Sequence, residues 1–179
     1  MPRCVAFLRA VNVGGRTVKM DALRSAFEAL ALTRVETFIA SGNVIFDSRA
    51  RDLAALERKI EAQLLASFGF EIDAFVRTLD EVAAVAAHPA FDAAAATTQV
   101  VGFLRSAPAP QALHTIAQMA TEVDRLQVQG RELLWFSDNR QSESVFSNAA
   151  FERALGMRTT FRSLNSLRKL LAKHAQNAA

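Results

Sequence analysis

An α+β fold made of two similar halves is predicted by three observations on this 179-residue chain. Strand and helix patterns follow one another in the order β-α-β-β-α-β over residues 3–77, and the same order then begins again. Hydrophobic residues form 51% of the chain and charged residues 22%, which excludes a disordered chain. The sequence therefore predicts two domains, at residues 1–79 and 80–179, with one larger α+β sheet as the alternative.

The first half begins with a short strand at residues 3–9 that leads into a turn-rich segment at 12–15. A helix follows, marked by four apolar residues at helical spacing: Met20, Leu23, Phe27 and Leu30. Residues 35–46 are rich in β-formers and are interrupted only at Ser41-Gly42-Asn43. A Gly-Asn pair between apolar runs predicts a two-residue hairpin turn, because glycine accepts the positive φ of a type II′ turn.

The second helix of this half carries four apolar residues on one face: Leu53, Leu56, Ile60 and Leu64. We expect a cap at Asp47 or Ser48 and an end at Gly69, followed by a strand at 70–77. This element order is the split βαβ of the ferredoxin-like sandwich, an antiparallel sheet with its helices on one face.

The second half repeats the order of elements after a linking helix near residues 80–87. A strand at 100–104, a helix at 109–119 and a hairpin of 124–128 with 133–136 turning at Gly130 come first. A helix at 144–155 that ends at Gly156, an extended piece at 159–161 and a last helix complete it. The chain thus predicts two ferredoxin-like βαββαβ halves in tandem.

The single cysteine, Cys4, excludes an internal disulfide and a multi-cysteine metal cluster. His114 is followed four positions later by a glutamine, so it lacks the helical spacing of paired metal ligands. We expect no metal and no cofactor. Apolar runs fall short of the roughly 18 residues of a membrane span, and Arg9 interrupts the apolar segment that a signal peptide would extend. We expect a cytoplasmic protein without membrane association.

Two polar, glycine-rich loops lie at the same end of an antiparallel β-α-β-β-α-β sheet, one after the first strand and one in the hairpin. Their residues form what we call the loop rim: Arg9, Asn12, Gly14, Gly15, Arg16, Lys19, Ser41, Gly42 and Asn43. Glycines let backbone N–H groups approach a ligand, and a helix start adds donors beside the positive side chains. We interpret the loop rim as an anion-binding site. The alternative is that its glycines only form turns.

The net charge of +3 is the sum of segments of opposite sign. Residues 1–24 contain five basic residues and one acidic residue, and residues 151–179 contain six and one, so the residues between them are net acidic. If the last helix packs near the loop rim, the two basic segments form one positive surface for phosphates or nucleic acid. The alternative is that both are ordinary solvated faces.

Four segments point to a family. Residues 8–15 read Leu-Arg-Ala-Val-Asn-Val-Gly-Gly, 19–23 read Lys-Met-Asp-Ala-Leu, 37–46 read Thr-Phe-Ile-Ala-Ser-Gly-Asn-Val-Ile-Phe, and 160–166 read Thr-Phe-Arg-Ser-Leu-Asn-Ser. They resemble the motifs of a bacterial family known as domain of unknown function 1697. The resemblance implies an α+β fold of ferredoxin-like halves and no particular activity.

This sequence departs from the family pattern at several positions, and those in the C-terminal motif matter most. Phe161, Ser163 and Leu164 replace the usual Thr, Asn and Trp, and Ala10 replaces a glycine. Arg162 and Asn165 match the family motif, so the resemblance adds them to the candidate ligand-binding residues.

Three functions follow from these observations. The first, which we favour, is that the loop rim with Arg162 and Asn165 binds a phosphate-bearing small molecule or nucleic acid. The second is an enzyme in which Arg9 or Arg162 stabilises developing negative charge, although the sequence offers no nucleophile. The third is an interaction module that pairs through a sheet edge with a partner or a second copy. A structural alternative is that Arg9 and Asn43 only tie the two loops together.

Overall fold

The computed structural model describes residues 1–39, 42–93 and 95–175. The chain divides into two compact units, Met1–Glu81 and Val82–Ala179. Each unit contains one four-stranded antiparallel sheet together with helices, which confirms the α+β class. In these described ranges, every helix is too short or too polar to cross a membrane.

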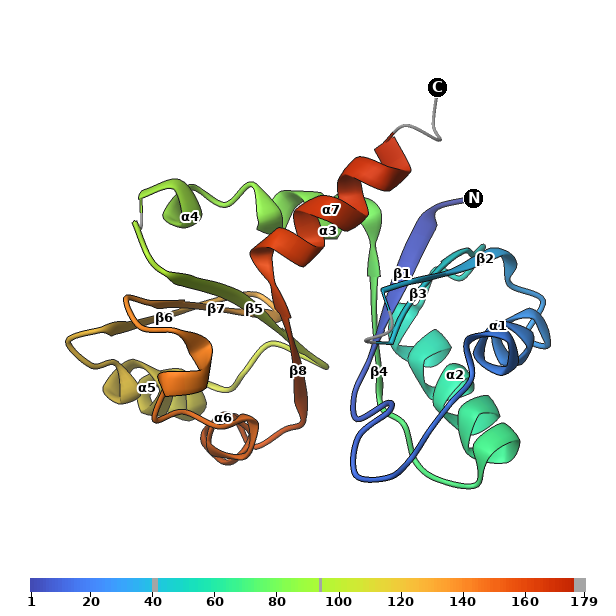
Figure 1. Ribbon diagram of the computed structural model, residues 1–179, viewed down its shortest axis with the longest axis horizontal. Coiled ribbons are helices and arrows are strands. Elements are labelled where there is room, and N and C mark those ends of the chain that lie inside the picture. The colour runs from blue at the N-terminus through green and yellow to red at the C-terminus, as the bar shows by residue number, and fades with distance from the viewer. Residues whose placement is uncertain (40–41, 94, 176–179) are drawn as a thin grey trace. The chain divides into compact units, whose positions relative to one another are not determined.

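The N-terminal unit contains six elements before the connection to the second unit: β1 (Arg3–Leu8), α1 (Met20–Glu28), β2 (Thr33–Phe38), β3 (Asn43–Asp47), α2 (Leu53–Phe68) and β4 (Ala74–Thr78). Its sheet has the strand order β2-β3-β1-β4, with all neighbours antiparallel. Helices α1 and α2 lie on the same face of this sheet (Figure 1). The loop rim begins directly after Leu8, the last residue of β1, which is an inner strand of this sheet.

The core of this unit follows from the alternation of side chains along a strand. Cys4, Ala6 and Leu8 of β1 belong to one buried cluster with Phe27 of α1 and Ile60 of α2. Each of the five is at most 1% exposed. This packing fixes the position of Leu8, the last residue of β1, and with it the start of the loop rim.

The hairpin prediction is wrong in its turn. Asn43 pairs with Phe38 and belongs to β3, so residues 39–42 join the strands instead of a two-residue Gly-Asn turn. Gly42 does have the positive φ expected of it, 78°. Ile39, at the start of the connection, also has a positive φ, 56°, so the longer loop has a left-handed residue at each end.

The predicted N-cap of α2 is also wrong, and its predicted end is confirmed. Asp47 closes β3, and the cap is Asp52, whose carboxylate accepts a hydrogen bond from the Ala55 N–H at 2.9 Å. Gly69 ends the helix in the left-handed conformation with φ 76°, as glycine commonly does at this position.

The C-terminal unit holds a second sheet: β5 (Thr98–Leu104), α5 (Pro110–Met119), β6 (Asp124–Gln129), β7 (Glu132–Ser137), η1 (Gln141–Glu143), α6 (Asn148–Leu155), β8 (Thr159–Ser163) and α7 (Leu164–Ala175). The strand order is β6-β7-β5-β8, again antiparallel throughout. Two further helices, α3 (Leu79–Ala86) and α4 (Pro89–Ala93), precede β5 in the chain.

Helices cover both faces of the second sheet. Phe151 of α6 and Ile116 of α5 join Trp135 of β7 in one buried cluster. The next residue of β7, Phe136, faces the other way and packs on Phe91 of α4 at 5.0 Å between ring centroids. The prediction that all helices lie on one face is therefore wrong for this unit, because α4 packs on the face opposite to α5 and α6.

The edge strand β4 has its outward backbone donors occupied by acidic side chains. Three N–H groups each donate to a glutamate: Ala74 to Glu61 at 3.0 Å, Val76 to Glu57 at 2.8 Å and Thr78 to Glu81 at 2.8 Å. Carboxylates in these positions compete with an incoming strand for the same donors. This edge is therefore a poor place for pairing with a partner, which weakens the interaction-module interpretation for β4.

The last strands of the two sheets share a local pattern around an arginine. Arg77 pairs with Val5, and Arg162 pairs with Val101. In each strand the guanidinium donates at 2.9 Å to the carbonyl of the preceding residue. The next residue, Thr78 or Ser163, uses its hydroxyl to accept the N–H three positions later and so caps the following helix.

Candidate functional site

The two loops of the predicted rim lie together in the structure. The Leu8 N–H donates to the carbonyl of Gly42 at 2.8 Å. A Cβ added to Gly42 would stand 3.2 Å from the Leu8 Cβ and 3.4 Å from the Val11 Cβ. The hairpin thus rests directly on the first residues of the β1–α1 loop, as the topology predicts. Ser41, another predicted rim residue, lies outside the described residues.

Arg9 and Asn43 make contacts within the protein fold. Asn43 is 3% exposed, and its side-chain amide donates to the Phe38 carbonyl at 3.0 Å. The Arg9 N–H donates to the Asp73 carbonyl at 2.9 Å, and the Arg9 guanidinium lies 3.8 Å from the Asp73 carboxylate. These contacts run within the hairpin and toward the segment before β4, so the structural alternative, in which the two residues tie the rim loops together, stays a prediction.

The loop after β1 contains an alternation of left-handed residues. Positive φ angles occur at Ala10 (61°), Asn12 (58°), Gly14 (61°) and Gly15 (79°). Alternating right- and left-handed residues turn successive backbone N–H groups toward one concave side, a geometry that binds anions. Outside glycine, asparagine and aspartate this conformation costs about 1–2 kcal/mol per residue, so Ala10 is strained.

Three consecutive N–H groups in this loop belong to exposed residues, at positions 13–15. Val13, Gly14 and Gly15 are exposed, and among the described residues none of their N–H groups donates a hydrogen bond. The Asn12 side chain accepts the Val18 N–H at 2.7 Å, which closes the loop on itself. The loop is therefore held in shape by Asn12 while three consecutive donors stay available.

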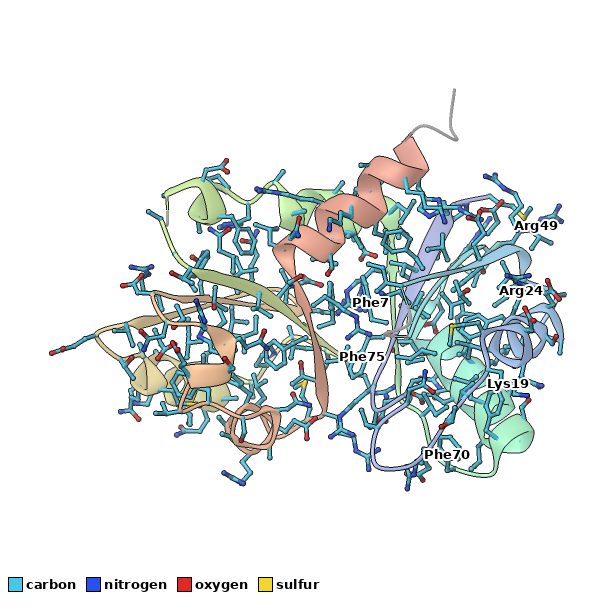
Figure 2. All side chains as sticks on the ribbon, in the orientation of Figure 1. Phe7, Lys19, Arg24, Arg49, Phe70 and Phe75 are labelled. Carbon is cyan, nitrogen blue, oxygen red and sulfur yellow. The ribbon has the colours of Figure 1, made fainter. Side chains whose placement is uncertain are left out.

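Two exposed basic residues follow these donors. The Arg16 guanidinium lies 5.0 Å from the ring centroid of Phe70, within the range of a cation–π contact. Lys19 precedes α1 and makes no side-chain cap bond to it. Figure 2 shows Phe70 and Lys19 on the side of the unit where the β1–α1 loop runs, and Arg49 near the opposite end of the sheet. Phe70 is not one of the predicted rim residues, and its contact with Arg16 was not predicted from the sequence.

The two candidates from the C-terminal motif differ in their surroundings. The Arg162 guanidinium donates at 2.9 Å to both the Thr160 hydroxyl and the Phe161 carbonyl. Burial lowers the pKa of Arg162 to about 10, so it stays charged at neutral pH. Asn165 is exposed and lines a cavity of about 340 Å³ together with Arg168. Both belong to the C-terminal unit, and their sharing one site with the loop rim stays a prediction.

Groups suited to metal binding or nucleophilic catalysis are scarce. In the part of the chain that the structure describes, no cluster of three His, Cys, Asp or Glu residues could hold a metal ion. Cys4 is fully buried in the sheet, and burial, with the nearby charges of Glu81 and Asp47, raises its pKa to about 11. A thiol held in this state is a poor nucleophile.

Known proteins similar to this chain include a family and a solved structure. A family described as "Protein of unknown function (DUF1697)" matches residues 1–134. A conserved bacterial protein from Streptococcus pneumoniae has a similar solved structure, with a TM-score of 0.76, 23% identity, and coverage of 97% of this chain and 98% of that chain. At this identity the likeness concerns the fold. No curated protein matches the chain. With three quarters of its length matched, the chain belongs to the DUF1697 family.

Proposed function

We propose that the loop rim of the N-terminal unit binds a phosphate-bearing small molecule. The observation that carries this proposal is the run of left-handed residues at 10, 12, 14 and 15, together with three N–H groups at exposed residues that donate no hydrogen bond among the described residues. Backbone nests of this kind bind phosphate through several N–H groups at once. Strained backbone in a loop is often retained because a ligand uses it.

Positive charge at the rim supports an anionic ligand. Arg16 and Lys19 are exposed and follow the free donors directly in the chain. The ring of Phe70 limits the freedom of the Arg16 guanidinium, which lowers the entropy lost when an anion binds. Backbone donors, a guanidinium and an ammonium together form a site for binding, and no described rim residue is placed as a nucleophile beside a base.

The test is a binding titration with the whole protein at low salt, using pyrophosphate, a nucleoside triphosphate and a single-stranded RNA oligonucleotide as probes. We expect Arg16→Gln with Lys19→Gln to weaken pyrophosphate binding by about tenfold or more, because each change removes a charge-assisted contact. Gly14→Ala should also weaken binding. A Cβ there meets nothing within 4 Å, so its effect comes from the backbone.

The control is Arg49→Gln with Arg51→Gln, which removes the same charge from exposed positions that follow β3. If the control variant loses as much pyrophosphate affinity as the rim variant, the loss comes from net charge and not from the loop rim. Unmeasurable affinity for all three probes would refute the proposal. A steep salt dependence seen only with RNA would instead assign the rim to nucleic acid, since the slope grows with the number of phosphates contacted.

We also infer that the two units are ferredoxin-like halves in tandem, divided near residue 80. Support comes from their matching strand orders, β2-β3-β1-β4 and β6-β7-β5-β8, and from the shared arginine pattern of Arg77 and Arg162. An experimental structure with a different strand order in either sheet would overturn this inference.

A further inference from the structure

We propose that the C-terminal unit binds a small molecule in which a planar aromatic ring is joined to an anionic group. This site is separate in residues from the loop rim and does not depend on it. It consists of two cavities that share Gln141 as a lining residue, one of about 320 Å³ and one of about 340 Å³. Each volume lies within the range of roughly 300–1,000 Å³ that small-molecule pockets occupy.

The smaller cavity is walled by four aromatic rings: Trp135, Phe146, Phe151 and Phe161. The Trp135 ring meets Phe146 at 6.0 Å and 79°, and Phe161 at 6.3 Å and 77°, both edge-to-face. Phe151 lies 5.1 Å from Phe146 and 5.2 Å from Phe161 between centroids. Rings that fix one another in this way form a rigid wall, which favours a flat aromatic ligand over a flexible chain.

The wall is held in place from behind. The buried Trp135 indole N–H donates to the Asp124 carboxylate at 2.9 Å. Phe161 lies over Gly102 of the neighbouring strand, where a Cβ would come within 2.6 Å of its ring. Glycine at 102 therefore sets the position of Phe161. Phe146 and Phe161 remain partly exposed, so their faces are accessible to a ligand.

The larger cavity is polar and carries positive charge. Asn165 and Arg168 project from the first turns of α7, and both are exposed. Arg168 lies 3.6 Å from Asp92, but both partners are more than half exposed, and such a pair is worth little and can be replaced by another anion. Gln141 lies on both cavities and can hydrogen-bond to a ligand that spans them. An aromatic wall beside amide and guanidinium donors fits a ring with an attached phosphate or carboxylate.

Trp135 is the single tryptophan of the chain, so its fluorescence reports on this site. The whole protein is titrated with phenyl phosphate and with benzoate, which carry the same ring with a phosphate or a carboxylate and do not emit where tryptophan does. Ribose 5-phosphate serves as the anion without an aromatic ring. We expect a saturable change in Trp135 emission with at least one of the ringed anions and none with ribose 5-phosphate. The stronger of the two ringed ligands identifies the anionic group.

Arg168→Gln and Asn165→Ala should each raise the apparent Kd about tenfold, because each removes a hydrogen bond to the anionic group. The matched control is Lys169→Gln, an exposed neighbour on α7 that does not line the cavity, and it should leave the Kd unchanged. The Arg16→Gln, Lys19→Gln protein should also bind as the wild type does, which separates this site from the loop rim. No saturable change with either ringed anion, an equal response to ribose 5-phosphate, or Kd values unaffected by both α7 variants would overturn the proposal.

Discussion

The buried Glu57 is predicted to stabilise the N-terminal unit far more than its neighbour Glu61, although each carboxylate accepts one hydrogen bond from the backbone of β4. Each accepts one outward N–H of that strand, from Val76 and Ala74 respectively. Glu57 differs because its carboxylate also lies 3.8 Å from the guanidinium of Arg77, and both side chains are at most 1% exposed. Substitutions of the two glutamates therefore separate two contributions to the free energy of unfolding: a charged acceptor for one N–H of β4, and a buried ion pair.

Glutamine keeps the size and one acceptor oxygen of glutamate, and it replaces the second oxygen and the charge with a neutral NH2 donor. Glu61→Gln should lower the free energy of unfolding by about 1 kcal/mol, the difference between a charged and a neutral acceptor. Glu57→Gln should lower it by about 3–5 kcal/mol, because it removes one partner of a buried pair. Urea unfolding followed by circular dichroism measures both values.

The double variant Glu57→Gln with Arg77→Met provides the control for the pair. It removes both charges and keeps a side-chain acceptor for the Val76 N–H, so it should cost less than Glu57→Gln alone, which leaves the Arg77 charge buried without the charge of Glu57. If Glu57→Gln costs no more than Glu61→Gln, the Arg77 contact contributes nothing and the reasoning is refuted.

Three further predictions concern backbone and burial. Burial raises the pKa of Cys4 from 9.0 to about 11, so the folded state keeps a proton that the unfolded state loses. Stability should then fall by about 2–3 kcal/mol as pH rises from 9 to 11, and Cys4→Ala, measured by urea unfolding across this range, should remove the fall. Gly42→Ala and Gly69→Ala share a left-handed φ of 78° and 76°, but only Gly42 has a tight Cβ contact. Gly42→Ala should therefore lower the melting temperature more than Gly69→Ala does, which corresponds to an extra loss of about 1 kcal/mol in the free energy of unfolding. Equal decreases in melting temperature would mean that the hairpin moves to accommodate the new Cβ at no cost. Gly102→Ala should cost about 1–3 kcal/mol and change the emission of Trp135, since the Phe161 ring must move. Wild-type stability and emission would contradict the role of Gly102.

Hydrophobic periodicity was sufficient to predict most elements and the α+β class. β1 and α1 are recovered because their apolar residues face one core at the spacing of their own structure. The hairpin turn and the α2 cap could not be predicted in this way. Asn43 is equally suited to a turn and to a strand start, and Asp47, Ser48 and Asp52 are all good caps. Only the register with β1 and β2 decides between them.

The candidate sites show the same division between local and long-range information. Gly14, Gly15 and Lys19 are neighbours in sequence, so the loop rim could be predicted from composition and topology. The aromatic cavity could not, because Gly102 and Phe161 meet only through the pairing of β5 with β8. A local signal for the arginine pattern does exist, since Arg77 and Arg162 are both followed by a hydroxyl residue and a leucine.

Amide chemical shifts in a titration with inorganic phosphate test the proposed binding function most directly. A ¹⁵N-labelled sample of the whole protein reports each backbone N–H separately. The loop-rim account predicts saturable shifts at Val13, Gly14 and Gly15, with smaller changes near Lys19, that weaken as salt is added. Shifts confined to other parts of the chain, or no saturable shift at these three amides, would contradict it.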